Sequence, residues 1–212
     1  MLLDAVFVLL ILTNLILLGS SLLSASIRIV AVQGAVLGVL PFLAMAPDRL
    51  GRVLFLAVLT VALKGGVFPW LLNRALREVH VRREVAPLVG YSVSLALGIG
   101  LLALAFWLGG RIRDIGLGVS VLSLSTALFM MFTGLFLVIS RQKALSQVLG
   151  FLVLENGIYA FGLLVVVNIH WLIELGVLLD VFVAVFIMGV AIDQISRAFD
   201  HMDVDQMNHL KG

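Results

Sequence analysis

The chain has 212 residues, 62% of them hydrophobic and only 12% charged, with a mean hydropathy of +1.21. Soluble domains carry about 25% charged residues, so this composition excludes an ordinary soluble domain and indicates an integral membrane protein. The absence of cysteine excludes disulfides and Cys-ligated metal clusters, and the four histidines are not closely paired, so we expect no metal site. The formal net charge of +2 gives no support for a nucleic-acid partner, and we expect none.

Apolar runs long enough to cross a membrane, which takes about 20 residues as a helix, follow one another along the chain. They span residues 2–18, 29–46, 53–72, 85–109, 115–139, 144–169 and 171–192. Asn14 and Gln33 interrupt the first two runs, and the connections are short and polar or basic. We therefore expect an all-α, polytopic membrane bundle of about seven transmembrane helices, without a catalytic domain of its own.

The distribution of Lys and Arg over the connections predicts the orientation of the bundle. One side receives Arg49, Arg52, Arg111 and Arg113. The other side receives a larger set, which consists of Arg28, Arg74, Arg77, Arg82, Arg83, Arg141, Lys143, Arg197 and Lys211. The positive-inside rule then places the N-terminus outside and the C-terminus in the cytoplasm, provided that all seven helices form.

Two acids lie deep inside the last two runs. Glu155 lies about 18 Å along its helix from Lys143, and Asp180 lies about 15 Å along the next helix from His170. Since these helices run in opposite directions, both carboxyl groups fall near the middle of a hydrocarbon layer about 30 Å thick. An ionisable group there costs roughly 2.5–3.5 kcal/mol, so a proton relay is the first hypothesis. The alternative is a pair of protonated acids that hydrogen-bond neighbouring helices.

The third run contains a lysine close to a proline. Pro69 has no N–H and its ring crowds the carbonyl of Gly65, so we expect a kink beside Lys64. Lys64 lies about 15 Å from Arg74, which marks the cytoplasmic interface. Two interpretations remain open: Lys64 is a cation in a buried polar path, or its long side chain reaches the cytoplasmic edge.

Three further residues are candidate accessories to this path. Tyr159 follows Glu155 by one helical turn and lies on the same face. Glu174 stands near His170 at the start of the last run, where an acid suits a helix N-terminus. Glu174 is therefore either a structural residue or the exit of a proton path.

Gly34 and Gly38 form a Gly-x-x-x-Gly pattern in the second run. Small residues at this spacing allow two membrane helices to approach closely. We expect ordinary bundle packing, with one close helix contact, at this position.

Short motifs in the last third of the chain carry a resemblance to a known family. They are Ser-Arg-Gln-Lys at 140–143, Leu-Glu-Asn-Gly at 154–157, Glu-Leu-Gly at 174–176, Asp180, and the tail motifs at 203–205 and 210–212. With these motifs the chain resembles the hydrogenase-4 component E family, membrane subunits of formate hydrogenlyase-type group 4 nickel–iron hydrogenase complexes. The seven-run layout and the lysine in the third run extend the resemblance over the chain.

The same last three helices resemble the K subunit of bacterial complex I and the C subunit of multisubunit cation/proton antiporters. Each of those subunits carries two membrane carboxylates in its last two helices. By this likeness Asp180 matches the final-helix carboxylate, shortened from Glu to Asp. Glu155 departs from the pattern, because it lies about one helical turn further along relative to Gly150 and Asn156, on the same face.

The resemblance implies a multi-pass subunit of a redox-driven proton or Na⁺ pump in a prokaryotic cytoplasmic membrane. Glu155 and Asp180 would be relay carboxylates and Lys64 their cationic partner. The redox centres would lie on partner subunits, with no cofactor and no catalytic residue in this chain. Its partners would be other membrane subunits, antiporter-like subunits among them, and the surrounding lipid bilayer.

The resemblance also suggests a division of the chain and leaves two alternatives. We expect an N-terminal transmembrane region at 1–140, a two-helix region with buried acids at 141–197, and a cytoplasmic tail at 198–212. The alternatives are a subunit of a cation/proton antiporter without a redox arm, and a structural spacer that seals and positions its partners.

Overall fold

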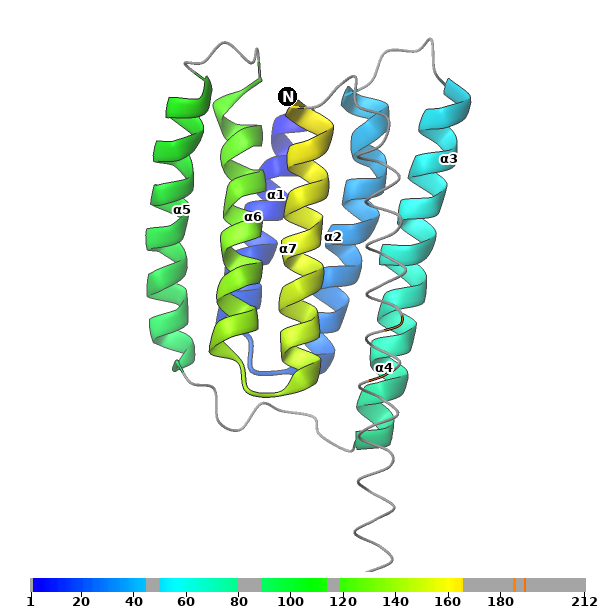
Figure 1. The fold of residues 1–212 in the computed structure, drawn as a ribbon, viewed down its shortest axis with the longest axis vertical. Coiled ribbons are helices and arrows are strands. Elements are labelled where there is room, and N and C mark those ends of the chain that lie inside the picture. The colour runs from blue at the N-terminus through cyan, green and yellow to red at the C-terminus, as the bar shows by residue number, and fades with distance from the viewer. Residues whose placement is uncertain are drawn as a thin grey trace, which may run out of the picture.

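The computed structural model describes residues 2–44, 50–79, 89–113 and 119–165, together with Val185 and Gly189. Within these ranges all regular elements are helices that run side by side in alternating directions (Figure 1). In chain order they are α1 (Leu2–Gly19), α2 (Leu23–Ala44), α3 (Leu50–Thr60), the π-helical segment η2 (Val61–Val67), α4 (Phe68–Val79), α5 (Tyr91–Arg113), α6 (Val121–Ser140) and α7 (Ala144–Val165).

Five of the described helices are long and apolar enough to cross a membrane. They comprise Leu2–Gly19, Leu23–Pro41, Tyr91–Arg113, Val121–Ser140 and Ala144–Leu164. The chain is therefore an all-helical membrane protein, as its composition predicts. The predicted third helix is found as α3, η2 and α4 in direct succession. Apart from Val185 and Gly189, the predicted seventh helix at 171–192 lies outside the described residues, so the count of seven and the orientation stay predictions.

Several helices begin at residues other than those predicted: α3 begins at Leu50 rather than near residue 53, and α5 begins at Tyr91 rather than near residue 85. For two more helices the structure shows a local reason. α2 begins at Leu23 rather than near residue 29, because the hydroxyl of Ser26 donates to the Leu22 carbonyl at 3.1 Å and so remains compatible with a helix. α6 begins at Val121 rather than near residue 115, because Ser120 is its N-cap. The hydroxyl of Ser120 accepts a hydrogen bond from the Ser123 N–H at 3.1 Å.

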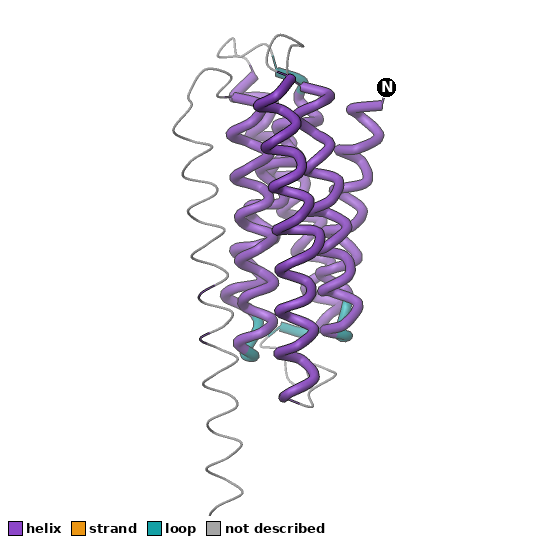
Figure 2. The backbone as a smooth tube through the Cα atoms, turned by 90° about the vertical axis from the view of Figure 1, so that its right-hand side faces the viewer, coloured by secondary structure: helices purple, strands orange, loops and turns teal. Residues whose placement is uncertain are grey.

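The helices form a bundle with α5 at one edge and the α3–η2–α4 rod at the other (Figure 1). Turned by 90°, the same helices remain roughly parallel to one another (Figure 2). α5 packs against α1 and α6, whereas the α3–η2–α4 rod packs against α2. Between these edges, α7 packs against α6 and α2. The exposed residues of the helices are largely leucine, valine, isoleucine and tryptophan, as expected for a surface that faces lipid.

The buried apolar side chains gather in two clusters, one toward each end of the bundle. The upper cluster, at the end where α1 begins, consists of Phe7, Leu10, Leu37, Leu40, Ala127, Met130 and Ala160. The lower cluster, toward the α1–α2 and α6–α7 connections, includes Leu17, Leu18, Ile27, Val30, Phe68, Leu72, Leu137, Leu149 and Leu152. Between the two clusters lies a set of buried polar residues from several helices.

Glycines bring α6 and α7 into close backbone contact. A Cβ atom on Gly150 would lie 2.7 Å from the backbone nitrogen of Val138, and one on Gly157 would lie 2.6 Å from that of Met131. A Cβ on Gly134 would collide with the backbone of Leu154. Only glycine allows this approach, which fixes the position of α7 and thus of Glu155, the residue after Leu154.

The close contact that the Gly-x-x-x-Gly pattern predicts is present, and the partner is the π-helical segment. A Cβ on Gly34 would lie 2.5 Å from the Cβ of Lys64 and 2.8 Å from its carbonyl carbon, while one on Gly38 would collide with Val61. α2 therefore packs directly on the backbone that carries Lys64.

Gly134→Ala tests the α6–α7 contact. We expect it to lower the stability of the protein in detergent micelles by about 1–3 kcal/mol, because the added methyl overpacks the contact with Leu154. The matched control is Gly100→Ala, where an added Cβ meets open space and alanine favours the helix by about 0.5–1 kcal/mol. Thermal unfolding measures both, and equal losses in the two variants would contradict the glycine contact.

Candidate functional site

A layer of buried polar side chains separates the upper and lower clusters. Its members are Thr13 and Asn14 of α1, Gln33 of α2, Lys64 of η2, Thr133 of α6, and Glu155 and Asn156 of α7. None of them is more than 8% exposed. Polar groups at this depth are costly in a membrane unless they pair, so this polar layer is the candidate functional site.

Lys64 and Glu155 form an ion pair inside the polar layer. The Nζ of Lys64 donates to the Oε1 of Glu155 at 2.8 Å, and the two side chains are only 5% and 3% exposed. The residues are 91 positions apart in the sequence and lie on different helices. Lys64 is thus enclosed in the bundle and does not reach either of its ends, which favours the first of the two interpretations of this lysine.

The π-helical turn explains how Lys64 comes to face α7. Pro69 has no N–H to donate to the carbonyl of Gly65, so the regular α-helical pattern cannot continue through this turn. Instead the N–H of Phe68 donates to the carbonyl of Leu63, five residues earlier, which is the π-helical bond. The expected disturbance beside Lys64 therefore takes the form of a widened turn, a feature that is frequent at functional sites.

Tyr159 lies against the same lysine. The centre of its ring is 5.3 Å from the Nζ of Lys64, within the range of a cation–π contact. Because Tyr159 and Glu155 are one turn apart on α7, Lys64 meets both on one helix face. The structure thus brings together three of the residues that the sequence singles out.

On the α1–α2 side, the polar layer continues through amides and a hydroxyl. The Nε2 of Gln33 donates to the Oγ1 of Thr13 at 3.1 Å, and the Nδ2 of Asn14 donates to the carbonyl of Leu10 at 2.7 Å. The carbonyl oxygens of both amides are buried, and the described part of the chain offers them no hydrogen-bond partner. Such groups usually bind ordered water. In the sequence Asn14 and Gln33 stand out only as interruptions of two apolar runs, and an amide inside a spanning helix is the signal that points to this place in the polar layer.

A small cavity lies beside the ion pair. Lys64 and Asn156 line it together with Pro69, and apolar side chains from α2, α4 and α7 complete its wall. Its volume of about 10 Å³ is close to the minimum that one water molecule needs. One water there would be in reach of polar atoms of the layer.

The other predicted site residues, Asp180, Glu174 and His170, lie outside the described residues. The predicted pairing of Glu155 with Asp180 therefore stays a prediction. Across residues 2–44, 50–79, 89–113 and 119–165, no three histidine or acidic side chains come together in a way that could hold a metal ion.

Comparison with known proteins gives one match along most of the chain. Over 190 residues the chain is 34% identical to the uncharacterized protein Rv0085 of Mycobacterium tuberculosis, covering 89% of this chain and 86% of the relative. The chain belongs to the Rv0085 family. No protein-family model matches the chain, and no solved structure does.

A second likeness is more limited in extent. The chain is 30% identical over 90 residues to hydrogenase-4 component E of Escherichia coli, and equally to that of Shigella flexneri. This stretch is 42% of the chain and 42% of component E, so the chain spans less than half of that relative's length. The resemblance to hydrogenase-4 component E is thereby supported over part of the chain.

A double-mutant cycle measures the Lys64–Glu155 interaction. We expect Lys64→Gln and Glu155→Gln each to destabilise the protein by about 3–5 kcal/mol, because either leaves a buried charge without its partner. The double variant should be destabilised by much less than the sum of the two single destabilisations. The free energy of unfolding of each variant is measured in detergent. The control is Asp4→Asn at an exposed acid of α1, and its free energy of unfolding should lie within about 0.5 kcal/mol of the native value. Additive losses would mean that the two charges do not interact.

The π-helical turn can be tested with Pro69→Ala. An alanine restores the N–H that the Gly65 carbonyl needs, so we expect the turn to become α-helical and Lys64 to rotate away from Glu155. The coupling energy in the double-mutant cycle should fall by at least about half relative to the native background. An unchanged coupling energy would show that Pro69 does not set the position of Lys64.

Proposed function

We propose that the chain is a membrane subunit of a complex I-related, hydrogenase-type respiratory or hydrogen-evolving complex. In this proposal its buried charged residues form part of a proton or Na⁺ path that is coupled to electron transfer in partner subunits. The observation that carries the proposal is the Lys64–Glu155 ion pair, enclosed in a polar layer that lies between two apolar clusters.

A buried ion pair is suited to a relay because it responds strongly to a third charge. At an effective dielectric constant of 20, two unit charges 4 Å apart interact by about 4 kcal/mol. A proton that arrives next to Glu155 therefore removes much of the attraction that holds Lys64. The flexible lysine side chain can then turn to another acceptor, which passes the change in charge along the layer.

The likeness to hydrogenase-4 component E supports the choice of complex. That relative is named as a component of a hydrogenase, and the chain matches 42% of it. Asp180 is the proposed next relay carboxylate, with Glu174, His170 and Tyr159 as accessory groups. The redox centres are proposed to lie on partner subunits in a prokaryotic cytoplasmic membrane, and antiporter-like subunits are the proposed neighbours.

Two other functions compete with the relay. In a structural spacer, the Lys64–Glu155 pair would only hold η2 against α7. This is the second candidate function, and the observation that favours it is that the pair joins residues 91 positions apart in the sequence. In a cation/proton antiporter without a redox arm, the same pair would serve ion exchange. Mass spectrometry of the subunits that co-purify with the chain separates these complexes.

The relay is tested in the assembled complex with Glu155→Gln and with the double variant Lys64→Gln, Glu155→Gln. We expect both to reduce ion translocation per electron by at least about tenfold, because the proton-carrying group is lost. Only the single variant should also weaken the fold, since the double variant leaves no unpaired charge. Translocation is measured in proteoliposomes against electron-transfer rate, and assembly by native gel.

The double variant distinguishes the relay from the spacer. A double variant that assembles and translocates ions at the native ratio would support the spacer and exclude the relay. Asp4→Asn again serves as the control, because it neutralises an exposed acid of α1 away from the polar layer.

A further inference from the structure

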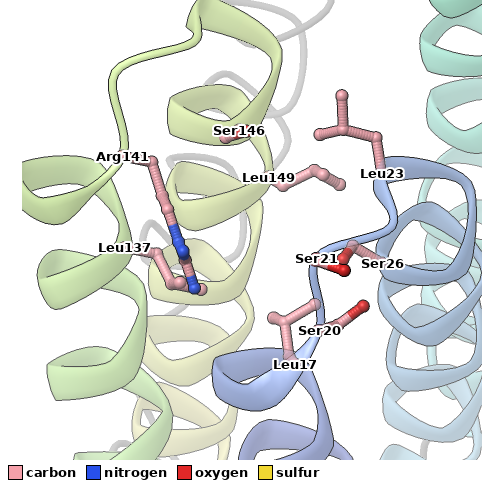
Figure 3. Close-up of a pocket in the computed structure, with 9 residues that line it drawn as sticks. All are labelled: Leu17, Ser20, Ser21, Leu23, Ser26, Leu137, Arg141, Ser146 and Leu149. Carbon is pink, nitrogen blue, oxygen red and sulfur yellow. The ribbon is translucent and has the colours of Figure 1, made fainter. Parts of the chain in front are cut away.

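A second cavity lies at the end of the bundle where short connections join α1 to α2 and α6 to α7. It is partly open to its surroundings, and its volume is about 20 Å³ on the measure that gives about 10 Å³ for the cavity beside the ion pair. Its lining residues are Leu17, Ser20, Ser21, Leu23, Ser26, Leu137, Arg141, Ser146 and Leu149 (Figure 3). Figure 3 shows Arg141 entering from the α6 side, with Ser20, Ser21 and Ser26 on the opposite side.

Arg141 differs from the other arginines whose side chains the structure describes. Arg28, Arg74, Arg77, Arg111 and Arg113 are exposed, as interfacial arginines usually are, whereas Arg141 is only 3% exposed. Its Nη2 donates to the carbonyl of Leu18 at 3.2 Å, and its guanidinium carbon lies 4.7 Å from the centre of the Tyr91 ring. The sequence placed this arginine among the loop charges, but the fold turns it inward and holds it in place.

The chemistry of the cavity wall favours an anion. Arginine matches phosphate with two parallel hydrogen bonds. The hydroxyls of Ser20 and Ser26 donate to the Leu22 carbonyl in this structure, and rotation about the Cβ–Oγ bond lets a hydroxyl donate to a phosphate instead. Ser26 and Ser146 belong to the first turns of α2 and α7, whose positive dipole ends add to the field. Asp4 and Glu155, the acids whose side chains are described, do not line the cavity.

The apolar part of the wall favours a lipid as the source of that phosphate. Leu17, Leu23, Leu137 and Leu149 lie next to the polar groups, so the cavity has a polar and an apolar side. It also lies at the end of spanning helices, which is the depth of lipid headgroups. We propose that this cavity binds a phosphate group through Arg141 and the surrounding serines, and that the group belongs to an anionic phospholipid. The proposal is independent of the relay.

The test uses the full chain, purified and delipidated, in neutral detergent. Thermal unfolding is followed with added phosphatidylglycerol, with phosphatidylcholine, and with sodium phosphate against sodium chloride at equal ionic strength. We expect phosphatidylglycerol to raise the unfolding temperature more than phosphatidylcholine does, and sodium phosphate to have no effect at millimolar concentration. Protection by sodium phosphate equal to that by the lipid would keep the phosphate site and overturn the lipid as its source.

Variants locate the effect in the cavity. Arg141→Gln should weaken binding of phosphatidylglycerol by at least about tenfold, because it removes the charged hydrogen bonds between the guanidinium and the phosphate. Ser21→Asp, which adds a negative charge to the wall and keeps Arg141, should abolish the preference for phosphatidylglycerol even if Arg141→Gln fails to fold. Arg74→Gln is the matched control, because Arg74 is exposed, stacks on Trp70 and does not line the cavity. A preference for phosphatidylglycerol that survives in Ser21→Asp, or is lost equally in Arg74→Gln, would overturn the proposal.

Discussion

A lysine and a glutamate remain inside a membrane bundle only when each is held against the other, and the rest of this structure serves that requirement. The Lys64–Glu155 distance of 2.8 Å demands that α2, η2, α6 and α7 approach one another closely. Gly34 permits the approach on one side, where α2 meets the backbone of Lys64, and Gly134 permits it on the other, where α6 meets α7. The glycines therefore act on the electrostatics of the site through packing.

The direction of the lysine depends on backbone geometry in its own helix. Pro69 interrupts the α-helical bonding and the π-helical segment absorbs the interruption, so the proline helps to set the direction of a lysine five residues before it. The two apolar clusters then confine the charges to one depth. In this arrangement the polar groups do not replace the hydrophobic core but divide it into two parts.

The spanning helices follow from apolar runs in the sequence, and the importance of Lys64, Glu155 and Tyr159 follows from the cost of polar groups at membrane depth. The contact between these residues cannot be derived from the sequence, because it depends on the rotation of each helix about its axis. A π-helical turn changes that rotation, and the sequence does not show by how much. The place of the Asn14 and Gln33 amides in the polar layer does not follow either, because a single amide in an apolar run carries little signal. Nor does the burial of Arg141, because a loop arginine is indistinguishable in sequence from an interfacial one unless the fold turns it inward.

The 91-residue separation of the ion pair has a consequence for biogenesis. At a synthesis rate of 5–20 residues per second, Lys64 leaves the ribosome about 5–20 s before Glu155 does. During that interval the helix that carries Lys64 has no carboxylate from α7 to neutralise it in the hydrocarbon. Until α7 is made, insertion of this helix therefore carries the cost of a lysine without its carboxylate, roughly 2.5–3.5 kcal/mol near the centre of the hydrocarbon.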